Sequence, residues 1–192
     1  MKLSKRGEYA LRSMINLGIA TKVNRSLVRV TELAQAEGIP VKFLEQIMQQ
    51  LREGGFVESE RGKHGGYRLA KPASRIPVGQ IVRLIDGPLA PIGCVSQTAY
   101  EPCNCPDPDH CGLRMLMLDV RNAIAAILDR YTLADVVEVT TRKLISSGRP
   151  LPYSTPVETA SANGKRHQTR ARTSTDNPTE GVIHQLLGDY AI

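Results

Sequence analysis

Four cysteines have the clearest capacity for chemistry in this sequence, and they stand within one segment, from Cys94 to Cys111. Eight residues separate Cys94 from Cys103, one separates Cys103 from Cys105, and five separate Cys105 from Cys111. In a cytosolic protein, such a group of thiols indicates metal or redox chemistry before a disulfide framework. The segment 88–112 also holds five prolines, so we expect a loop without regular structure.

Several chemistries fit this spacing. Thiolates at short loop spacing suit iron–sulfur clusters, which is the leading prediction. A zinc site formed by all four cysteines is the main alternative, although a one-residue gap between ligands is less usual for zinc than a two-residue gap. A reversible disulfide that joins Cys103 or Cys105 to Cys94 or Cys111 is a third. His110 is a further candidate ligand, and a chemically inert cluster also stays open.

The segment after the cysteines is expected to be helical. Apolar residues at i+3 and i+4 spacing predict a long helix from Leu113 to about Tyr131. The start of this helix, next to Cys111, would stabilise a thiolate there. Thr132 is expected to cap a last helix, which runs to about Ile145.

The first 87 residues predict three helices, a hairpin and a fourth helix. Capping residues and glycines delimit the helices, and two short apolar runs around a glycine-rich tip predict the hairpin. The expected boundaries are Ser4 to about Ala20, a short β-favouring stretch at 27–30, Thr31 (as the cap) to Gly38, Pro40 or Val41 to Gly54, strands at 56–60 and 67–69, and Pro77 to Gly87. This order is that of a winged helix-turn-helix, so the predicted fold class is mainly α with a small β-hairpin wing.

The third helix has two different faces. Its apolar residues, at positions 43, 44, 47, 48 and 51, form one stripe that would anchor the helix to the scaffold. The opposite face is polar and is suited to reading base edges in the major groove of DNA. The candidate DNA-binding residues on this face are Lys42, Glu45, Gln46 and Gln49.

The hairpin tip is rich in glycine and in positive charge. Five basic residues and no acidic residue lie between Arg61 and Arg75. Glycines let a tip turn sharply and approach phosphates closely, so we expect it to contact the DNA backbone or the minor groove. The candidate DNA-binding residues here are Arg61, Lys63, His64, Gly65, Gly66, Tyr67 and Arg68. The alternative is a tight turn whose charges are only solvated.

The charge distribution favours the same function. The chain has a net charge of +6, and residues 1–75 hold 14 of its 25 basic but only 7 of its 19 acidic residues. A basic domain is the electrostatic footprint of a phosphate-backbone binder. We do not expect an enzyme, because the sequence contains no glycine-rich nucleotide loop, nucleophile elbow or metalloprotease helix.

These stretches together resemble the Rrf2 family of winged helix-turn-helix regulators, of the IscR, NsrR and CymR type. The resemblance covers about residues 1–145, and the third helix followed by the glycine-rich wing is its most specific part. The matching stretches are Leu3–Ser4 to Tyr9–Ala10 with Met14, Ile39 to Gln46, Leu51–Arg52, Gly54 to Val57, Ser59 to Gly62, Gly65 to Leu69 and Ile81 to Pro88.

The resemblance implies a homodimer on double-stranded palindromic DNA, with the long C-terminal helix as the dimerisation helix. It implies that Lys42, Glu45 and Gln46 read bases and that Arg61 acts from the wing. Glu45 would sense a cytosine amino group, a pairing that is physically sensible. The implied function is a transcriptional regulator, a repressor rather than an activator, whose operator affinity is set by an iron–sulfur cluster or by thiol redox state.

The resemblance also implies a ligand set. Related regulators bind a cluster through three cysteines with five residues in each gap, or a close variant, and only the gap from Cys105 to Cys111 matches. The implied ligands are therefore Cys94, Cys105 and Cys111, with Cys103 as a substitute or a fourth. Glu8 stands where some family members use an acidic residue from the partner subunit. The other interpretation of Glu8 is a solvated first-turn residue favoured by the helix dipole.

The expected organisation is a DNA-binding domain at 1–87, a cysteine-rich sensor loop at 88–112, dimerisation helices at 113–145 and a disordered tail at 146–192. Within the tail, 182–187 could form a brief helix or a docking peptide. No apolar run is long enough to span a membrane and no signal-peptide core follows the N-terminus, so we expect a cytoplasmic protein. The alternatives are a zinc-stabilised or ligand-free regulator, and a protein-interaction adaptor on the same fold that does not bind DNA.

Overall fold

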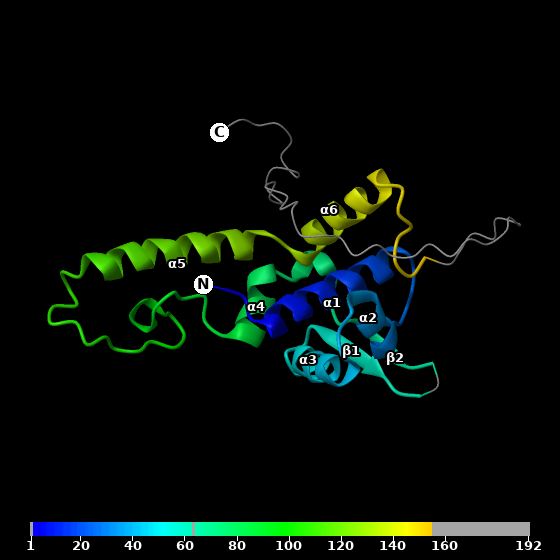
Figure 1. The fold of residues 1–192 in the computed structure, drawn as a ribbon, viewed down its shortest axis with the longest axis horizontal. Coiled ribbons are helices and arrows are strands. Elements are labelled where there is room, and N and C mark those ends of the chain that lie inside the picture. Colours follow the sequence, from blue (N-terminus) through cyan, green and yellow to red (C-terminus); the bar gives the residue numbers. More distant parts are fainter. Residues whose placement is uncertain (1, 63, 155–192) are drawn as a thin grey trace, which may run out of the picture.

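The computed structural model describes residues 2–62 and 64–154. Within them the chain forms six α-helices, two short 3-10 turns and a two-stranded antiparallel sheet. Figure 1 shows a body that contains α1–α4, the sheet and α6, from which α5 and the cysteine segment extend. The elements are α1 Lys5–Lys22, α2 Val30–Glu37, α3 Val41–Glu53, β1 Val57–Glu60, β2 Gly66–Leu69, α4 Val78–Asp86, α5 Gly112–Arg130 and α6 Leu133–Ser146. None of the helices in this part of the chain has the length and apolar character needed to cross a membrane.

Helix α1 contributes heavily to the main core and begins as predicted. The Ser4 hydroxyl caps it by accepting a hydrogen bond from the Gly7 N–H at 3.0 Å. The helix runs to Lys22, slightly beyond the expected end at Ala20. Its buried residues, such as Met14, share one core with buried residues of α2, α3, β1 and α6. A single core therefore supports both the helix-turn-helix and the C-terminal helix.

Helix α2 starts earlier than predicted. Its N-cap is Arg29, so the prediction that Thr31 caps this helix is wrong. The carboxylate of Glu32 accepts a hydrogen bond from the Arg29 N–H at 3.1 Å, which satisfies a donor at the helix start without a capping hydroxyl. The helix ends at Gly38, as predicted.

The wing is tied to the chain that precedes α2. The strands β1 and β2 pair with Val57 opposite Leu69. On the other side of β2, Val28 and Tyr67 exchange backbone hydrogen bonds of 3.0 and 2.8 Å. The β-favouring stretch predicted at 27–30 therefore forms one isolated bridge, because α2 already begins at Val30.

Helix α6 returns to the body. Thr132 caps it as predicted, and Asp135 completes a capping box. Leu133 and Val137 belong to the main core. A Cβ atom added to Gly18 of α1 would lie 2.4 Å from Val137 Cγ2, so the glycine allows α1 and α6 to touch. Helix α6 thus packs with the N-terminal helices, while α5 packs on α4 through Ile124, Ala125 and Leu128 and extends beyond the body.

The chain after α6 lies against this body, and we call residues 147–154 the C-terminal strap. The sequence predicts disorder from 146, but Ser146 ends α6, and Leu151 and Tyr153 of the strap pack against the main core. The expectation of disorder therefore fails for 146–154. Residues 155–192, with the predicted helix or docking peptide at 182–187, lie outside the described residues.

Candidate DNA interface and cysteine pocket

Helix α3 presents the predicted polar face to solvent. The exposed side chains on it are Lys42, Glu45, Gln46 and Gln49. The apolar stripe beneath them is confirmed, and its fully buried members are Leu44, Ile47, Met48 and Leu51. Phe43 at the edge is half-buried and meets the ring of Tyr9 edge-on, with 6.0 Å between ring centres. Arg6 of α1 also donates to the Gln50 side chain at 2.9 Å, so both apolar and polar contacts hold the orientation of α3.

The tip of the wing combines a backbone turn with charged side chains. A Cβ atom on Gly65 would lie 2.2 Å from the Glu60 carbonyl oxygen, so this close approach requires glycine. Arg61 and His64 are exposed, whereas Gly65, Gly66 and Tyr67 are half-buried. Lys63 lies outside the described residues.

The two candidate arginines of the wing have different surroundings. Arg68 forms ion pairs with Glu58 at 3.0 Å and Glu60 at 2.6 Å. These carboxylates, Glu58 first, raise the pKa of Arg68. Arg61 forms no ion pair with any described residue. Of these two arginines, it is therefore the one whose charge is available to a phosphate or a base.

An arginine-lined groove of about 490 Å³ lies between the start of α2, the end of α3 and the wing. Arg29, Arg52 and Arg61 line it, together with Glu60 and the half-buried Tyr67. Arg29 and Arg52 are not among the DNA-binding residues predicted from the sequence. Arg29 reaches the groove because the backbone bridge at Val28 joins the start of α2 to the wing, a contact that no local pattern predicts.

All four cysteines are free thiols, and all four line one pocket of about 250 Å³. Cys94 is buried in a 3-10 turn, Gly93–Val95. Cys111 is the N-cap of α5, which confirms its predicted position at the start of the long helix. Cys103 and Cys105 are half-buried in the loop between them. The loop predicted at 88–112 is confirmed except for that one turn and for Gly112, which begins α5.

Hydrogen bonds among the thiols shift two of their pKa values in opposite directions. The backbone N–H of Cys105 lowers the pKa of Cys103, with the thiols of Cys105 and Cys94 adding to the effect. Hydrogen bonding with Cys103, followed by desolvation and the thiol of Cys111, raises the pKa of Cys105 to about 11. The four thiols therefore interact as one connected group.

This donor set fits a thiolate-bound metal group in type and number. Within residues 2–62 and 64–154, however, no three His, Cys, Asp or Glu side chains are grouped so that they could hold a metal ion. The four thiols share one pocket, but they are not arranged in the geometry of a metal site.

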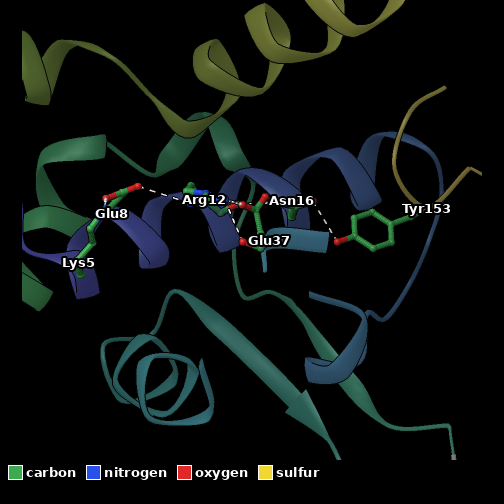
Figure 2. A network of polar contacts seen from close by, with 6 residues as sticks. All are labelled: Lys5, Glu8, Arg12, Asn16, Glu37 and Tyr153. Atoms are coloured by element: carbon green, nitrogen blue, oxygen red, sulfur yellow. Dashed lines mark hydrogen bonds and ion pairs between the residues drawn. The ribbon is translucent and has the colours of Figure 1, made fainter. Parts of the chain in front are cut away.

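The two further candidate ligands lie elsewhere in this chain. Glu8 forms ion pairs with Lys5 at 2.7 Å and Arg12 at 3.5 Å, and its hydrogen bond with Lys5 lowers its pKa. Figure 2 shows it in a polar network along α1. His110 is exposed and contacts Asp107 through Nδ1 at 2.8 Å. Neither residue lines the cysteine pocket.

Known proteins match this chain over most of its described residues. Residues 3–139 match the family model Rrf2, described as an iron-dependent transcriptional regulator. An rrf2-like HTH-type transcriptional regulator of Rhodobacter capsulatus is 35% identical over 137 residues, which are 70% of this chain and 91% of that protein. The HTH-type regulator IscR of Vibrio atlanticus is 28% identical over 182 residues, which are 95% of this chain and 98% of that protein.

The solved structure of CymR, the global cysteine regulator of Bacillus subtilis, superposes with a TM-score of 0.61. It is 30% identical and covers 72% of this chain and 98% of its own. These relatives are transcriptional regulators and not enzymes, which agrees with the predicted class. With the winged helix in place and the family model matched over most of the chain, the protein belongs to the Rrf2 family of transcriptional regulators.

Proposed function

We propose that this regulator binds double-stranded, palindromic operator DNA through α3 and the wing. The observation that carries the proposal is the exposed polar face of α3 beside a groove lined by three arginines. Polar side chains on a rigidly seated helix suit base edges in the major groove, and arginines at its border suit phosphates. The proposed contacts are Lys42, Glu45, Gln46 and Gln49 from α3, and Arg61, Lys63, His64, Gly65, Gly66, Tyr67 and Arg68 from the wing.

We infer that the protein acts as a homodimer through α5. Five large apolar side chains of this helix are exposed, and they are Leu113, Met115, Leu116, Leu118 and Ile127. So many exposed large apolar side chains on one helix normally mark an interface. Because α5 extends from the body, a second copy could lie along it and leave both α3 helices free, as a palindromic site requires (Figure 1).

Operator binding and oligomeric state are tested together. Selection from random DNA, followed by titration with the selected site at several salt concentrations, should give an inverted repeat and a steep salt dependence. Sedimentation should show two chains for each site. If no DNA is selected and genomic fragments do not shift, the adaptor function replaces this one. In vitro transcription from a promoter that contains the site then separates repression, which we propose, from activation.

We propose an iron–sulfur cluster on Cys94, Cys105 and Cys111, with Cys103 as a substitute or fourth ligand. The four thiols on one pocket support it, and so does the description of the family as iron-dependent. When bound, the cluster would supply redox and iron responsiveness, and the cysteine segment would pass its state to α5 through Cys111 at the helix start. A regulator of this kind acts on chromosomal DNA, so we place it in the cytoplasm.

Anaerobic purification with visible spectra and iron and sulfide analysis tests the cluster. Iron and sulfide in equal amounts, lost in Cys94→Ser, Cys105→Ser and Cys111→Ser, is the expected result. Loss in Cys103→Ser as well would make Cys103 the fourth ligand, and retention would leave it as a substitute. Zinc without sulfide would identify the zinc site instead.

A thiol switch is the second candidate, favoured by the hydrogen bonding between neighbouring thiols. It predicts protein without metal whose count of titratable thiols falls by two on mild oxidation and recovers on reduction. Peptide mapping of the oxidised protein would then name the pair.

A further inference from the structure

The middle of α5 buries a positive charge. Arg121 is only 9% exposed, and it is the one charged residue among 2–62 and 64–154 that is buried. Its Nη2 donates to Asn122 Oδ1 at 2.5 Å, but its Nε has no hydrogen-bond partner. No carboxylate of the described residues pairs with it. A buried guanidinium stays protonated, so its lack of a counter-charge is costly to the fold.

Arg121 lines a small pocket between α4, α5 and residues 88–98. The polar side chains that share the lining are Arg83, Ser96, Gln97 and Thr98, and no carboxylate of the described chain lines it. Ser96 is itself buried, and its Oγ accepts the Ala99 N–H at 3.0 Å. The hydroxyl proton of Ser96 therefore remains to be donated to a group in the pocket.

The second arginine does not relieve the imbalance. Arg83 forms two parallel hydrogen bonds with Asp129, of 2.6 and 2.7 Å, so its charge is already matched. Asp129 raises the pKa of Arg83 through this contact. The pocket therefore combines one neutralised arginine and one unmatched arginine with hydroxyl and amide donors, which is the chemistry of an anion site.

We propose that this pocket binds a small monovalent anion of the size of chloride, bromide or formate. The guanidinium of Arg121 is the principal ligand, and Ser96 and Thr98 are additional donors. The free volume is about 30 Å³, which is enough for at least one water-sized group. A halide or a single carboxylate suits so small a pocket better than the bulkier sulfate or phosphate.

The site has a consequence for the cysteine segment. Residues 96–98 lie two to four positions after Cys94, and Arg121 belongs to the helix that Cys111 caps. An anion held by both would fasten the first half of the cysteine segment onto α5. Any effect of the thiol chemistry on anion affinity would then be reciprocal. The anion site itself depends on neither DNA binding nor a cluster.

Thermal unfolding of the full chain tests the site. The protein is kept at constant ionic strength in methanesulfonate and titrated with chloride, bromide, formate or sulfate. We expect a saturable rise in Tm with the three small anions, at lower concentrations than any rise with the bulkier sulfate. Arg121→Gln should abolish the rise, and Arg130→Gln, at an exposed position of the same helix, should retain it. An unchanged Tm in the wild type, or the same rise in Arg121→Gln, overturns the proposal.

A second measurement does not depend on how well Arg121→Gln folds. Wild-type protein should broaden the chloride NMR signal, and formate should compete this broadening away. Arg121→Lys, which keeps a charge but loses the planar fork, should bind at least several-fold more weakly. Crystals soaked in bromide should give an anomalous peak beside Arg121. Absence of both broadening and peak contradicts the site and points to a carboxylate of a second copy as the counter-charge.

Discussion

The phenol oxygen of Tyr153 donates a hydrogen bond to Asn16 Oδ1 across 3.0 Å, although 137 positions separate the two residues in the chain. Asn16 is buried, and its Nδ2 donates to the Arg12 carbonyl and to the carboxylate of Glu37 at the end of α2. Arg12 pairs with Glu37 as well. Figure 2 shows this network running along α1. The C-terminal strap is thereby connected to the helix-turn-helix.

Replacing Tyr153 tests that connection. In Tyr153→Phe the ring keeps its packing while Asn16 loses a partner, so we expect the free energy of unfolding to fall by about 0.5–1.5 kcal/mol. Chemical denaturation measures this difference. Tyr100→Phe is the matched control, because Tyr100 is 59% exposed and its substitution should change little. Equal effects of the two substitutions would mean that the strap bond does not stabilise the body.

The same tyrosine predicts a pH dependence. Burial, with Glu37 and Glu32 adding to it, raises the pKa of Tyr153 to about 12 from an ordinary value of 10.0. The folded state therefore holds the phenol proton more tightly than the unfolded state. Its contribution is complete below pH 10 and is lost as the pH rises from 10 towards 12. The fall in unfolding free energy over that range should be smaller in Tyr153→Phe, and identical falls would contradict the assignment.

The contact between α1 and α6 predicts that any side chain at position 18 will lower the free energy of unfolding. In Gly18→Ala the new methyl would lie 2.4 Å from Val137 Cγ2, so the helices must separate or Val137 must move. We expect a loss of about 1–3 kcal/mol in unfolding free energy. Gly112→Ala is the control, because a Cβ there has nothing within 4 Å. Partial rescue by Val137→Ala would confirm that this pair is the cause.

The exposed apolar side chains of α5 predict that a charge placed among them will weaken the dimer. Leu116 is 56% exposed, so Leu116→Glu should leave the chain folded but bury a carboxylate in the proposed dimer interface. Sedimentation should show a monomer, and the circular dichroism spectrum should be unchanged. Titration with the inverted repeat should show weaker binding. Ile145→Glu, a charge at an equally exposed apolar site of α6, should leave the dimer intact. A dimer in both variants would place the interface elsewhere.

The wing predicts a loss of operator affinity in Arg61→Ala. If this exposed arginine reads a base edge, affinity should fall by about 1–3 kcal/mol and selectivity at that base should relax. A contact with phosphate alone would weaken all sequences similarly and reduce the salt dependence. Arg130→Ala serves as the control for loss of one positive charge. Unchanged binding in a salt-matched titration would remove Arg61 from the interface.

Much of this protein follows from local sequence. The Ser4 and Thr132 caps, the stripe of α3 and the glycine-rich wing are each determined by residues a few positions apart, since capping and helical periodicity act over one or two turns. The polar face of α3 follows from the same periodicity. The third helix and the wing are also the most specific part of the resemblance to the Rrf2 family.

Tertiary structure decided what depends on distant residues. It placed Arg29 at the groove through the bridge at Val28, and held the strap on α1 by a bond between Tyr153 and Asn16. It also buried Arg121 without a carboxylate partner and with its Nε unsatisfied, which helical periodicity alone does not predict. The sequence determined that four thiols share one segment. Only folding of the loop against the start of α5 set which of them touch, because a proline-rich loop has no periodicity from which its side-chain directions follow.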